Sequence, residues 1–266
     1  MKVCIAQIRP KLLNVENNLD LHLKYINNAR EKGLDIIVFP ELSLTGYLTG
    51  WMTPIVALDL HSYEIKKILD SSKGMAVVFG AIIEENGQFY NSAVFVEDGE
   101  IRGIHKKVYL PTYGMFDEGR FFTAGSSFNL IHSRLGKFGI LICEDAWHLD
   151  SYLSYADADY ILLIANNPLR VVISDNSVNV WHRIASIPPL FFGIPTIYAN
   201  RVGVEDGIIF FGGSRVINGD GSVEAEGKIF EEDFITAEIK PHKSRAAKYK
   251  SATLREHLNA IRKNPR

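Results

Sequence analysis

Short apolar runs alternate with segments of helical periodicity along the first half of the chain. Apolar runs of this length predict strands, and apolar residues at i, i+3 and i+4 predict helices. An Asp98-Gly99 pair between the last two of these segments predicts a hairpin turn. The elements expected here are strands over residues 3–8, 35–40, 75–83, 91–98 and 100–106, and helices over 17–31 and 63–69. The order strand, helix, strand is typical of a layered α/β sheet.

The same pattern restarts after an irregular segment rich in aromatic residues, glycine and proline over residues 109–128. An NGDG sequence at 218–221 predicts a late hairpin. The other elements expected are strands over 138–143, 160–165, 195–200 and 235–239, and helices over 148–155 and 176–192. Two rounds of strand, helix and strand predict a pseudo-duplicated single domain over 1–266, with a basic helical tail from about residue 240.

Several predicted strands are continuously apolar instead of alternating with polar residues. The clearest are IIVF, FGILI and YILLI. Continuous apolar runs of this length indicate strands that are buried on both faces. We therefore expect an α/β fold in which two sheets pack back to back and helices cover the outside.

Composition excludes several classes of protein. The chain of 266 residues is 47% hydrophobic and 23% charged, with a mean hydropathy near zero, which excludes disordered, collagen-like and coiled-coil chains. Its only two cysteines, Cys4 and Cys143, exclude a disulfide framework and a thiolate zinc site. The eight histidines show no i, i+4 pair, so no metal site is expected. Neither a signal peptide nor a membrane span is recognisable, and we expect a cytoplasmic protein.

Charge is distributed unevenly although the net charge is only −2. Residues 240–266 carry nine Lys or Arg and one acidic residue, whereas the rest of the chain carries 20 basic and 30 acidic residues, a net charge of −10. Leu254, Leu258 and Ile261 follow a helical spacing, which predicts a terminal helix that docks on the domain. A subunit contact or an acidic partner is the alternative. Binding to nucleic acid or membrane is not expected, because the acidic remainder repels phosphates.

Three polar residues follow predicted strands, at the positions where α/β proteins place their sites. They are Glu41, Lys107 and Cys143. A thiolate is a strong nucleophile, a carboxylate can remove the thiol proton, and an ammonium can stabilise a developing oxyanion. Each residue alone is more often structural: a buried cysteine packs as a small hydrophobe, and a single charge caps a strand or faces solvent. The surrounding segments therefore decide the interpretation.

Three segments, in this order, resemble the signature blocks of the nitrilase superfamily, the carbon-nitrogen hydrolases. FPELSLTGY resembles the glutamate block, KKVYLP with FDEGRFF the lysine block, and GILICED the cysteine block. The resemblance spans nearly the whole chain. It implies a four-layer αββα sandwich, pairing of two subunits into an eight-layer homodimer, and catalysis on a small-molecule amide without a cofactor.

Further details resemble the glutaminase domain of glutamine-dependent NAD synthetases. They are PTYGMFDEGRFF, ICEDAW and GVEDGIIFFGGSRVINGDG. The ATP pyrophosphatase half of those enzymes has no counterpart in this sequence, which shows no Gly-rich phosphate loop of the Walker type. We therefore expect a free-standing amidase whose relatives act on the side-chain amide of glutamine.

The resemblance implies a role for each residue that matches a signature position. Glu41 matches the general base, Lys107 the oxyanion stabiliser and Cys143 the nucleophile. Glu118, in FDEGR, matches a second glutamate that helps to hold the geometry of the site. The backbone N–H of Glu144 is implied as a second oxyanion donor.

Substrate-binding residues are implied in the same way. Tyr47, Tyr113 and Phe116 match positions that line the glutamine pocket, although aromatic packing within a loop is an equal alternative. Asn167, in ANNPLR, stands where the synthetase-type domain usually has serine, a departure at a position that contacts substrate. Arg170 and Arg183 are candidate cations for an acidic substrate, or ordinary surface arginines.

The resulting prediction is a hydrolase that cleaves a linear amide through a cysteine thioester and releases ammonia and a carboxylic acid. Glutamine or another ω-amide is the expected substrate; an N-carbamoyl compound is the alternative. A non-catalytic or ammonia-supplying subunit of a larger complex is a second alternative. The AGSSF segment lacks the other elements of a serine amidase, and nothing around His182 or His242 resembles a papain-like partner of cysteine.

Overall fold

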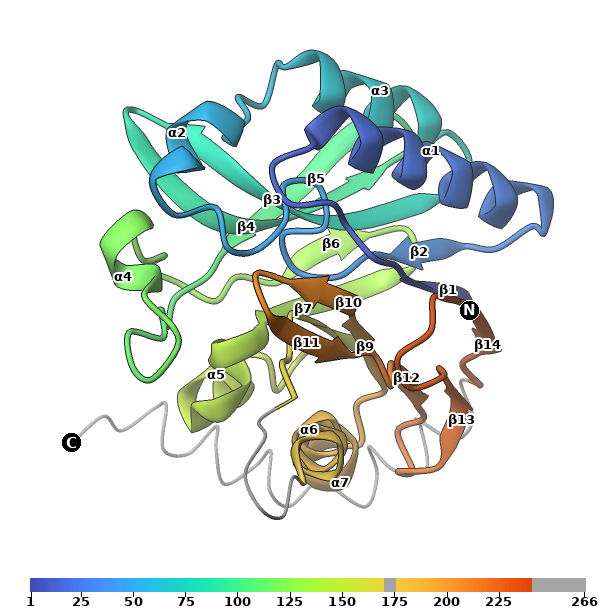
Figure 1. The fold of residues 1–266 in the computed structure, drawn as a ribbon. Helices are drawn as coiled ribbons and strands as arrows, with labels where there is room; N and C mark the ends of the chain where they lie inside the picture. The colour runs from blue at the N-terminus through green and yellow to red at the C-terminus, as the bar shows by residue number, and fades with distance from the viewer. Residues whose placement is uncertain (170–175, 241–266) are drawn as a thin grey trace.

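A computed structural model describes residues 1–169 and 176–240, and this part of the chain contains two six-stranded sheets packed face to face (Figure 1). The first sheet holds three parallel neighbours, β1, β2 and β3, flanked by antiparallel strands. Its strands, in spatial order, are β14 (Asp233–Glu238), β1 (Lys2–Gln7), β2 (Ile36–Val38), β3 (Ala76–Glu85), β4 (Gln88–Glu97) and β5 (Glu100–Lys106).

The second sheet repeats this plan. Its strands β7, β8 and β9 are parallel neighbours, again flanked by antiparallel strands. Their spatial order is β13 (Val223–Glu226), β12 (Arg215–Ile217), β9 (Thr196–Asn200), β8 (Tyr160–Ala165), β7 (Gly136–Ile142) and β6 (Ile131–Ser133). A separate hairpin joins β10 (Val202–Glu205) to β11 (Ile208–Phe211).

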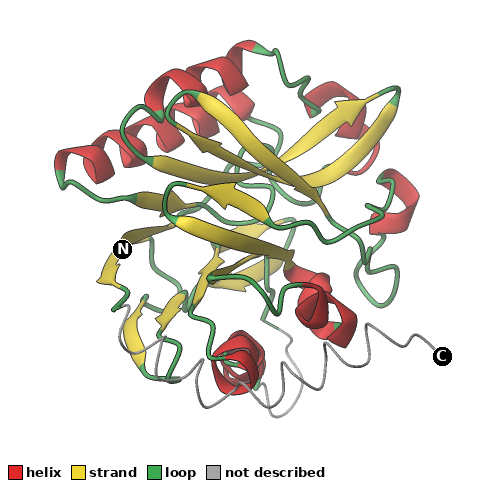
Figure 2. Ribbon diagram, turned by 180° about the vertical axis from the view of Figure 1, so that it is seen from behind, coloured by secondary structure: helices red, strands yellow, loops and turns green. Residues whose placement is uncertain are grey.

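Helices cover the outer face of each sheet, which completes four layers (Figure 2). On the first sheet lie α1 (Val15–Glu31) and α3 (Tyr63–Ser71). On the second lie α5 (Leu149–Ser154), α6 (Ser177–Ala185) and α7 (Ile187–Phe192). The loops carry α2 (Thr53–Val56), α4 (Glu118–Phe121) and two 3₁₀ helices, η1 (Gly50–Met52) and η2 (Cys143–Trp147). The predicted four-layer αββα sandwich is confirmed.

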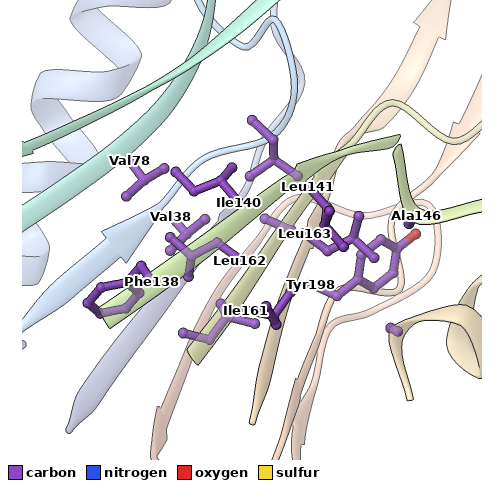
Figure 3. Packing of buried hydrophobic residues seen from close by; sticks show 14 of the residues in the cluster. Val38, Val78, Phe138, Ile140, Leu141, Ala146, Ile161, Leu162, Leu163 and Tyr198 are labelled. Atoms are coloured by element: carbon purple, nitrogen blue, oxygen red, sulfur yellow. The ribbon is translucent and has the colours of Figure 1, made fainter. Parts of the chain in front are cut away.

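Successive side chains of a strand point to opposite faces of the sheet, so each central strand contributes both to the core between the sheets and to the core under the helices. In β1, Val3 and Ile5 face the second sheet, whereas Cys4 and Ala6 pack under the helices of the first sheet. Figure 3 shows the interior between the sheets, where Val38 and Val78 of the first sheet approach Phe138 and neighbouring side chains of the second. Burial on both faces explains why these strands are continuously apolar in sequence.

Most predicted elements are confirmed, including the hairpin turns at Asp98-Gly99 and at 218–221. The predicted single helix over 176–192 is wrong: it is two helices, α6 and α7, separated at Ser186. Pro188 and Pro189 follow Ile187 in the first turn of α7, and proline cannot donate the backbone hydrogen bond that would continue α6. The sequence patterns also missed the β10–β11 hairpin.

Three sequence predictions concern regions or properties that the fold does not test. The basic tail predicted from about residue 240, with Leu254, Leu258 and Ile261, lies outside the described residues. The homodimer and the cytoplasmic location stay predictions. Among residues 1–169 and 176–240, no helix is long and apolar enough to cross a membrane.

Candidate active site

Loops at the ends of β2, β5 and β7 carry the three residues singled out in the sequence. Glu41 follows β2, Lys107 follows β5 directly, and Cys143 follows β7 directly. Gly80 of β3 permits the approach of the Glu41 loop, because a Cβ there would lie 2.2 Å from the backbone nitrogen of Leu42. The two sheets thus bring residues more than one hundred positions apart to one end of the sandwich.

A buried ion network lies at the centre of this end. The Lys107 ammonium donates to Glu41 Oε1 and to Glu118 Oε1, each at 2.7 Å. All three side chains are at least 95% buried. Tyr47, also buried, donates its hydroxyl to the same Glu118 oxygen at 2.7 Å. Lys107 is therefore held between two carboxylates in an environment with little water to screen them.

The Glu41 carboxylate is fixed by donors from both sheets. Its Oε1 accepts a second hydrogen bond from Asn91 Nδ2 at 2.8 Å, and its Oε2 accepts one from the backbone N–H of Asn166 at 2.8 Å. Asn91 belongs to β4 of the first sheet, whereas Asn166 follows β8 of the second. This carboxylate is therefore held in one orientation.

Cys143 occupies a backbone conformation that side-chain-bearing residues seldom adopt, with φ of 46° at the first residue of η2. The turn lets the chain change direction directly after the strand. The thiol lies 3.3 Å from Asn167 Oδ1, to which it donates, and Asn167 Nδ2 donates to the Tyr198 hydroxyl at 2.7 Å. Cys143 is buried, with 7% of the residue exposed.

Electrostatics couple the thiol to the ion network. Burial raises the pKa of Cys143 well above its ordinary value; Glu41 raises it further and Lys107 lowers it. Burial disfavours the Lys107 ammonium, but Glu118 and Glu41 outweigh that effect and keep its pKa well above the ordinary value. Burial raises the pKa of Glu118 to about 7, against the opposing pull of Lys107. These shifts favour a neutral thiol on Cys143 and a charged ammonium on Lys107.

Asp145 joins the cysteine turn to the lysine loop. Its Oδ1 accepts hydrogen bonds from the backbone N–H groups of Val108 and Tyr109, each at 3.0 Å. Its Oδ2 accepts from the backbone N–H of Ile142 at 3.1 Å and lies 2.8 Å from His105 Nε2. One fully buried carboxylate therefore fixes the segments on either side of Lys107 and Cys143 relative to each other.

A cavity of about 240 Å³ opens beside Glu118. Two of the predicted substrate-binding residues, Tyr47 and Phe116, line it together with Glu118. Their rings pack edge to face, with centroids 6.4 Å apart. The remaining lining residues come from the loops around η1 and α4 and from the β10–β11 turn: Leu48, Thr49, Gly50, Met115, Asp117, Phe121, Phe122 and, in the turn, Asp206.

The other predicted substrate-binding residues lie near the site but in different surroundings. Tyr113, half exposed, donates its hydroxyl to Glu144 Oε2 at 2.8 Å. Asn167 contacts the thiol directly. Arg183 is exposed on α6, and Arg170 lies outside the described residues. The structure thus brings Tyr47, Phe116 and Asn167 to the network, places Tyr113 at its rim, and gives Arg183 no contact with it.

Sequence reasoning missed four residues that hold this site. Asp145 stands inside the GILICED segment, so the motif contained it without indicating a role. Asn91 and Asn166 lie in or after apolar strands and resemble ordinary strand-end polar residues. Glu205, which contacts the loop of Tyr47, lies in the hairpin that the patterns did not predict.

Fold and site together define an αββα sandwich with a candidate cysteine-centred site, the architecture of the nitrilase superfamily. A family model for carbon-nitrogen hydrolases matches residues 2–249, and the chain belongs to this family. The resemblance inferred from the sequence segments is confirmed.

Known relatives extend this assignment. The chain is 32% identical to a glutamine-dependent NAD(+) synthetase of Acinetobacter baylyi, a match that covers 90% of this chain and 44% of the synthetase. It is 30% identical to a probable nitrilase of Schizosaccharomyces pombe, over 84% of this chain and 83% of the relative. A solved glutamine-dependent NAD+ synthetase from Acinetobacter baumannii superposes with a TM-score of 0.82 at 30% identity, covering 91% of this chain and 46% of that one. The chain therefore spans less than half the length of these synthetases.

Proposed function

We propose that this protein hydrolyses the amide carbon-nitrogen bond of a small molecule through a thioester on Cys143. The observation that carries the proposal is the buried contact of Lys107 with Glu41 and Glu118 beside a thiol held at a strand end. A nucleophile, a base and a cation within one dry site are the parts that acyl transfer requires.

In the first half of the reaction Glu41 acts as the general base. It takes the thiol proton while the sulfur attacks the amide carbonyl carbon, and the carbonyl oxygen becomes an oxyanion. The Lys107 ammonium stabilises that charge, together with the backbone N–H of Glu144 implied by the family resemblance. Glu41 then passes its proton to the nitrogen, the carbon-nitrogen bond breaks, and ammonia leaves.

Water completes the cycle. Glu41, ionised again, removes a proton from a water molecule that attacks the thioester carbon. The carbon-sulfur bond breaks, the thiolate recovers the proton from Glu41, and the carboxylic acid is released. No step requires a metal or an organic cofactor.

The expected substrate is glutamine or another ω-amide. This expectation is supported by the 32% identity to a glutamine-dependent NAD(+) synthetase and by the cavity that Tyr47 and Phe116 line next to Glu118. An N-carbamoyl compound is the alternative substrate.

A second candidate function is the supply of ammonia to a partner protein. It is supported by the similarity to synthetases whose names state that they depend on glutamine. In that case turnover of the free chain would be slow and would rise when the partner is present.

Ammonia release by the wild type and by Cys143→Ala tests the proposal. The panel contains glutamine, α-ketoglutaramate, succinamate, propionamide and an N-carbamoyl amino acid, and the variant reports contaminating hydrolases. Cys143-dependent release from one member establishes the chemistry and identifies the substrate class. Silence across the panel, with a Cys143 that iodoacetamide does not modify, would exclude the proposed reaction.

A further inference from the structure

The β10–β11 hairpin contributes a carboxylate that holds the backbone of the Tyr47 loop. Glu205, at the end of β10, is 4% exposed. Its Oε1 accepts hydrogen bonds from the backbone N–H groups of Tyr47 at 2.8 Å and of Leu48 at 2.6 Å. These residues are more than 150 positions apart, so the contact connects the first half of the chain with the last strands before the tail.

Arg201 holds the other oxygen of Glu205. The guanidinium, fully buried, donates to Glu205 Oε2 and also to the backbone carbonyl of Pro10 at 3.2 Å. Its planar group also lies over the ring of Phe210 in β11, 4.4 Å from the centroid. The carboxylate of Glu205 is therefore fixed on one side by Arg201 and on the other by the backbone of the Tyr47 loop.

The same hairpin supports the segment that contacts the thiol. The backbone N–H of Leu169 donates to the carbonyl of Ile209 at 2.7 Å, and Pro168 pairs with Phe210. Asn167, one residue before this contact, accepts from Cys143. In Figure 1 the hairpin is the orange-brown pair of strands near the centre, between the two layers of helices.

Tyr47 connects Glu205 to the ion network around Lys107. Its hydroxyl donates to the Glu118 oxygen that also accepts from Lys107. The position of that hydroxyl depends on the backbone of Tyr47, which Glu205 holds. A chain of direct contacts thus runs from Glu205 through Tyr47 to Glu118 and Lys107.

We infer that Glu205, held by Arg201, is a positioning residue that acts through the Tyr47 hydroxyl to hold Glu118 and Lys107 in their working geometry. The inference rests on the proposed amidase function. Glu205 itself touches none of the proposed reacting groups. Its predicted effect is on turnover, because Lys107 interacts with charge that develops only in the transition state.

A double-mutant cycle tests whether Glu205 acts on turnover through Tyr47. Glutamine at position 205 has one acceptor oxygen, which can serve Arg201 or the two N–H groups but not both. We expect Glu205→Gln to lower kcat about tenfold, with KM changed by less than about threefold. In a Tyr47→Phe background, which lacks the hydroxyl, we expect the same change to lower kcat by less than about twofold.

The rate of Cys143 alkylation by iodoacetamide gives a second readout of the same cycle. It requires no amide substrate, so it separates this inference from the proposed function. If the wild type releases no ammonia from any amide of the panel, the proposed function lacks support, whereas the alkylation cycle still shows whether Glu205 and Tyr47 are coupled.

A matched control and a second variant guard against a general loss of structure. Glu226→Gln removes the carboxylate of an exposed pair with Arg215 in the neighbouring hairpin and should leave both rates unchanged. If Glu205→Gln does not yield folded protein, Glu205→Asp keeps the charge beside Arg201 and withdraws it by one methylene from the N–H groups. Equal losses from the change at position 205 in both backgrounds would overturn the inference, since they would mean that Glu205 does not act through Tyr47.

Discussion

The two cysteines of this chain share burial but differ in their surroundings. Cys4 lies within β1, fully buried beneath the helices of the first sheet, and burial raises the pKa of its thiol strongly. Cys143 lies just beyond β7 in a left-handed turn, with its thiol coupled to Glu41 and Lys107. Burial alone makes a thiol inert, so the difference shows that the neighbouring base and cation, not the cysteine, define the candidate site.

The largest expected effect is the difference in turnover between alanine substitutions at the two cysteines. Cys143→Ala removes the proposed nucleophile and should lower turnover by at least about 10⁴-fold. Cys4→Ala, the matched control, should leave turnover within about twofold and cost stability only through lost packing. The measurement is ammonia release on the best amide of the panel, with thermal unfolding of both variants. Comparable turnover by folded Cys143→Ala and wild type would refute the thioester mechanism.

A smaller effect is expected from two adjacent lysines. Lys107→Ala removes the cation between Glu41 and Glu118, and we expect kcat to fall about 10²- to 10³-fold, as with other lost oxyanion donors. Lys106, one position earlier, pairs with Glu85 near the surface, so Lys106→Ala should leave kcat nearly unchanged. Steady-state kinetics of the two variants give the comparison, and similar kcat values for both would remove Lys107 from the mechanism.

The pH dependence of kcat/KM should show a smaller effect per pH unit than either of these substitutions. Burial raises the pKa of Glu118 to about 7, with Lys107 opposing and Glu41 adding to the rise. Only the ionised carboxylate gives charge-assisted contacts with Lys107 and Tyr47, so kcat/KM should fall about tenfold per pH unit below pH 7. Glu118→Gln should flatten that decline. Glu85→Gln, an exposed carboxylate, should not shift it.

The raised pKa of Glu118 also predicts the direction in which stability changes with pH. The folded protein holds the Glu118 proton up to about pH 7, whereas the unfolded chain releases it near the ordinary carboxyl value of 4.5. Between these values the folded state binds more protons, so this group's contribution makes the folded state less stable as pH rises from about 4.5 to about 7. Chemical unfolding of the wild type and of Glu118→Gln across this range measures the contribution. If the difference in free energy of unfolding between the two proteins does not change with pH, this prediction is wrong.

The parts of this molecule that were predictable from sequence are those with local signals. Strands such as β7 and β8 are readable because burial on both faces requires continuous apolar residues. Glu41, Lys107 and Cys143 were found because each follows such a strand and lies in a recognisable segment. Pro188 and Pro189 were visible as well, but helical periodicity continued past them and concealed the break between α6 and α7.

Contacts between distant residues could not be predicted in this way. Asp145 fixes the lysine loop through two backbone N–H groups, and Glu205 fixes the Tyr47 loop through two others. A carboxylate that accepts from backbone groups far along the chain leaves no periodic pattern, since any residue except proline can supply the N–H. The cavity beside Glu118 likewise depends on how the loops of η1 and α4 meet, which no local segment specifies.

Competitive alkylation tests the central claim, that charge around Cys143 activates its thiol, most directly. The native protein is treated with substoichiometric iodoacetamide, and peptide mass spectrometry measures modification of Cys143 and Cys4 in the same sample, for the wild type and for Lys107→Ala. We predict that Cys143 reacts at least about a hundredfold faster than Cys4 in the wild type, and that Lys107→Ala reduces the Cys143 rate at least about tenfold. Equal slow modification of both thiols, or a Cys143 rate that does not depend on Lys107, would contradict the account.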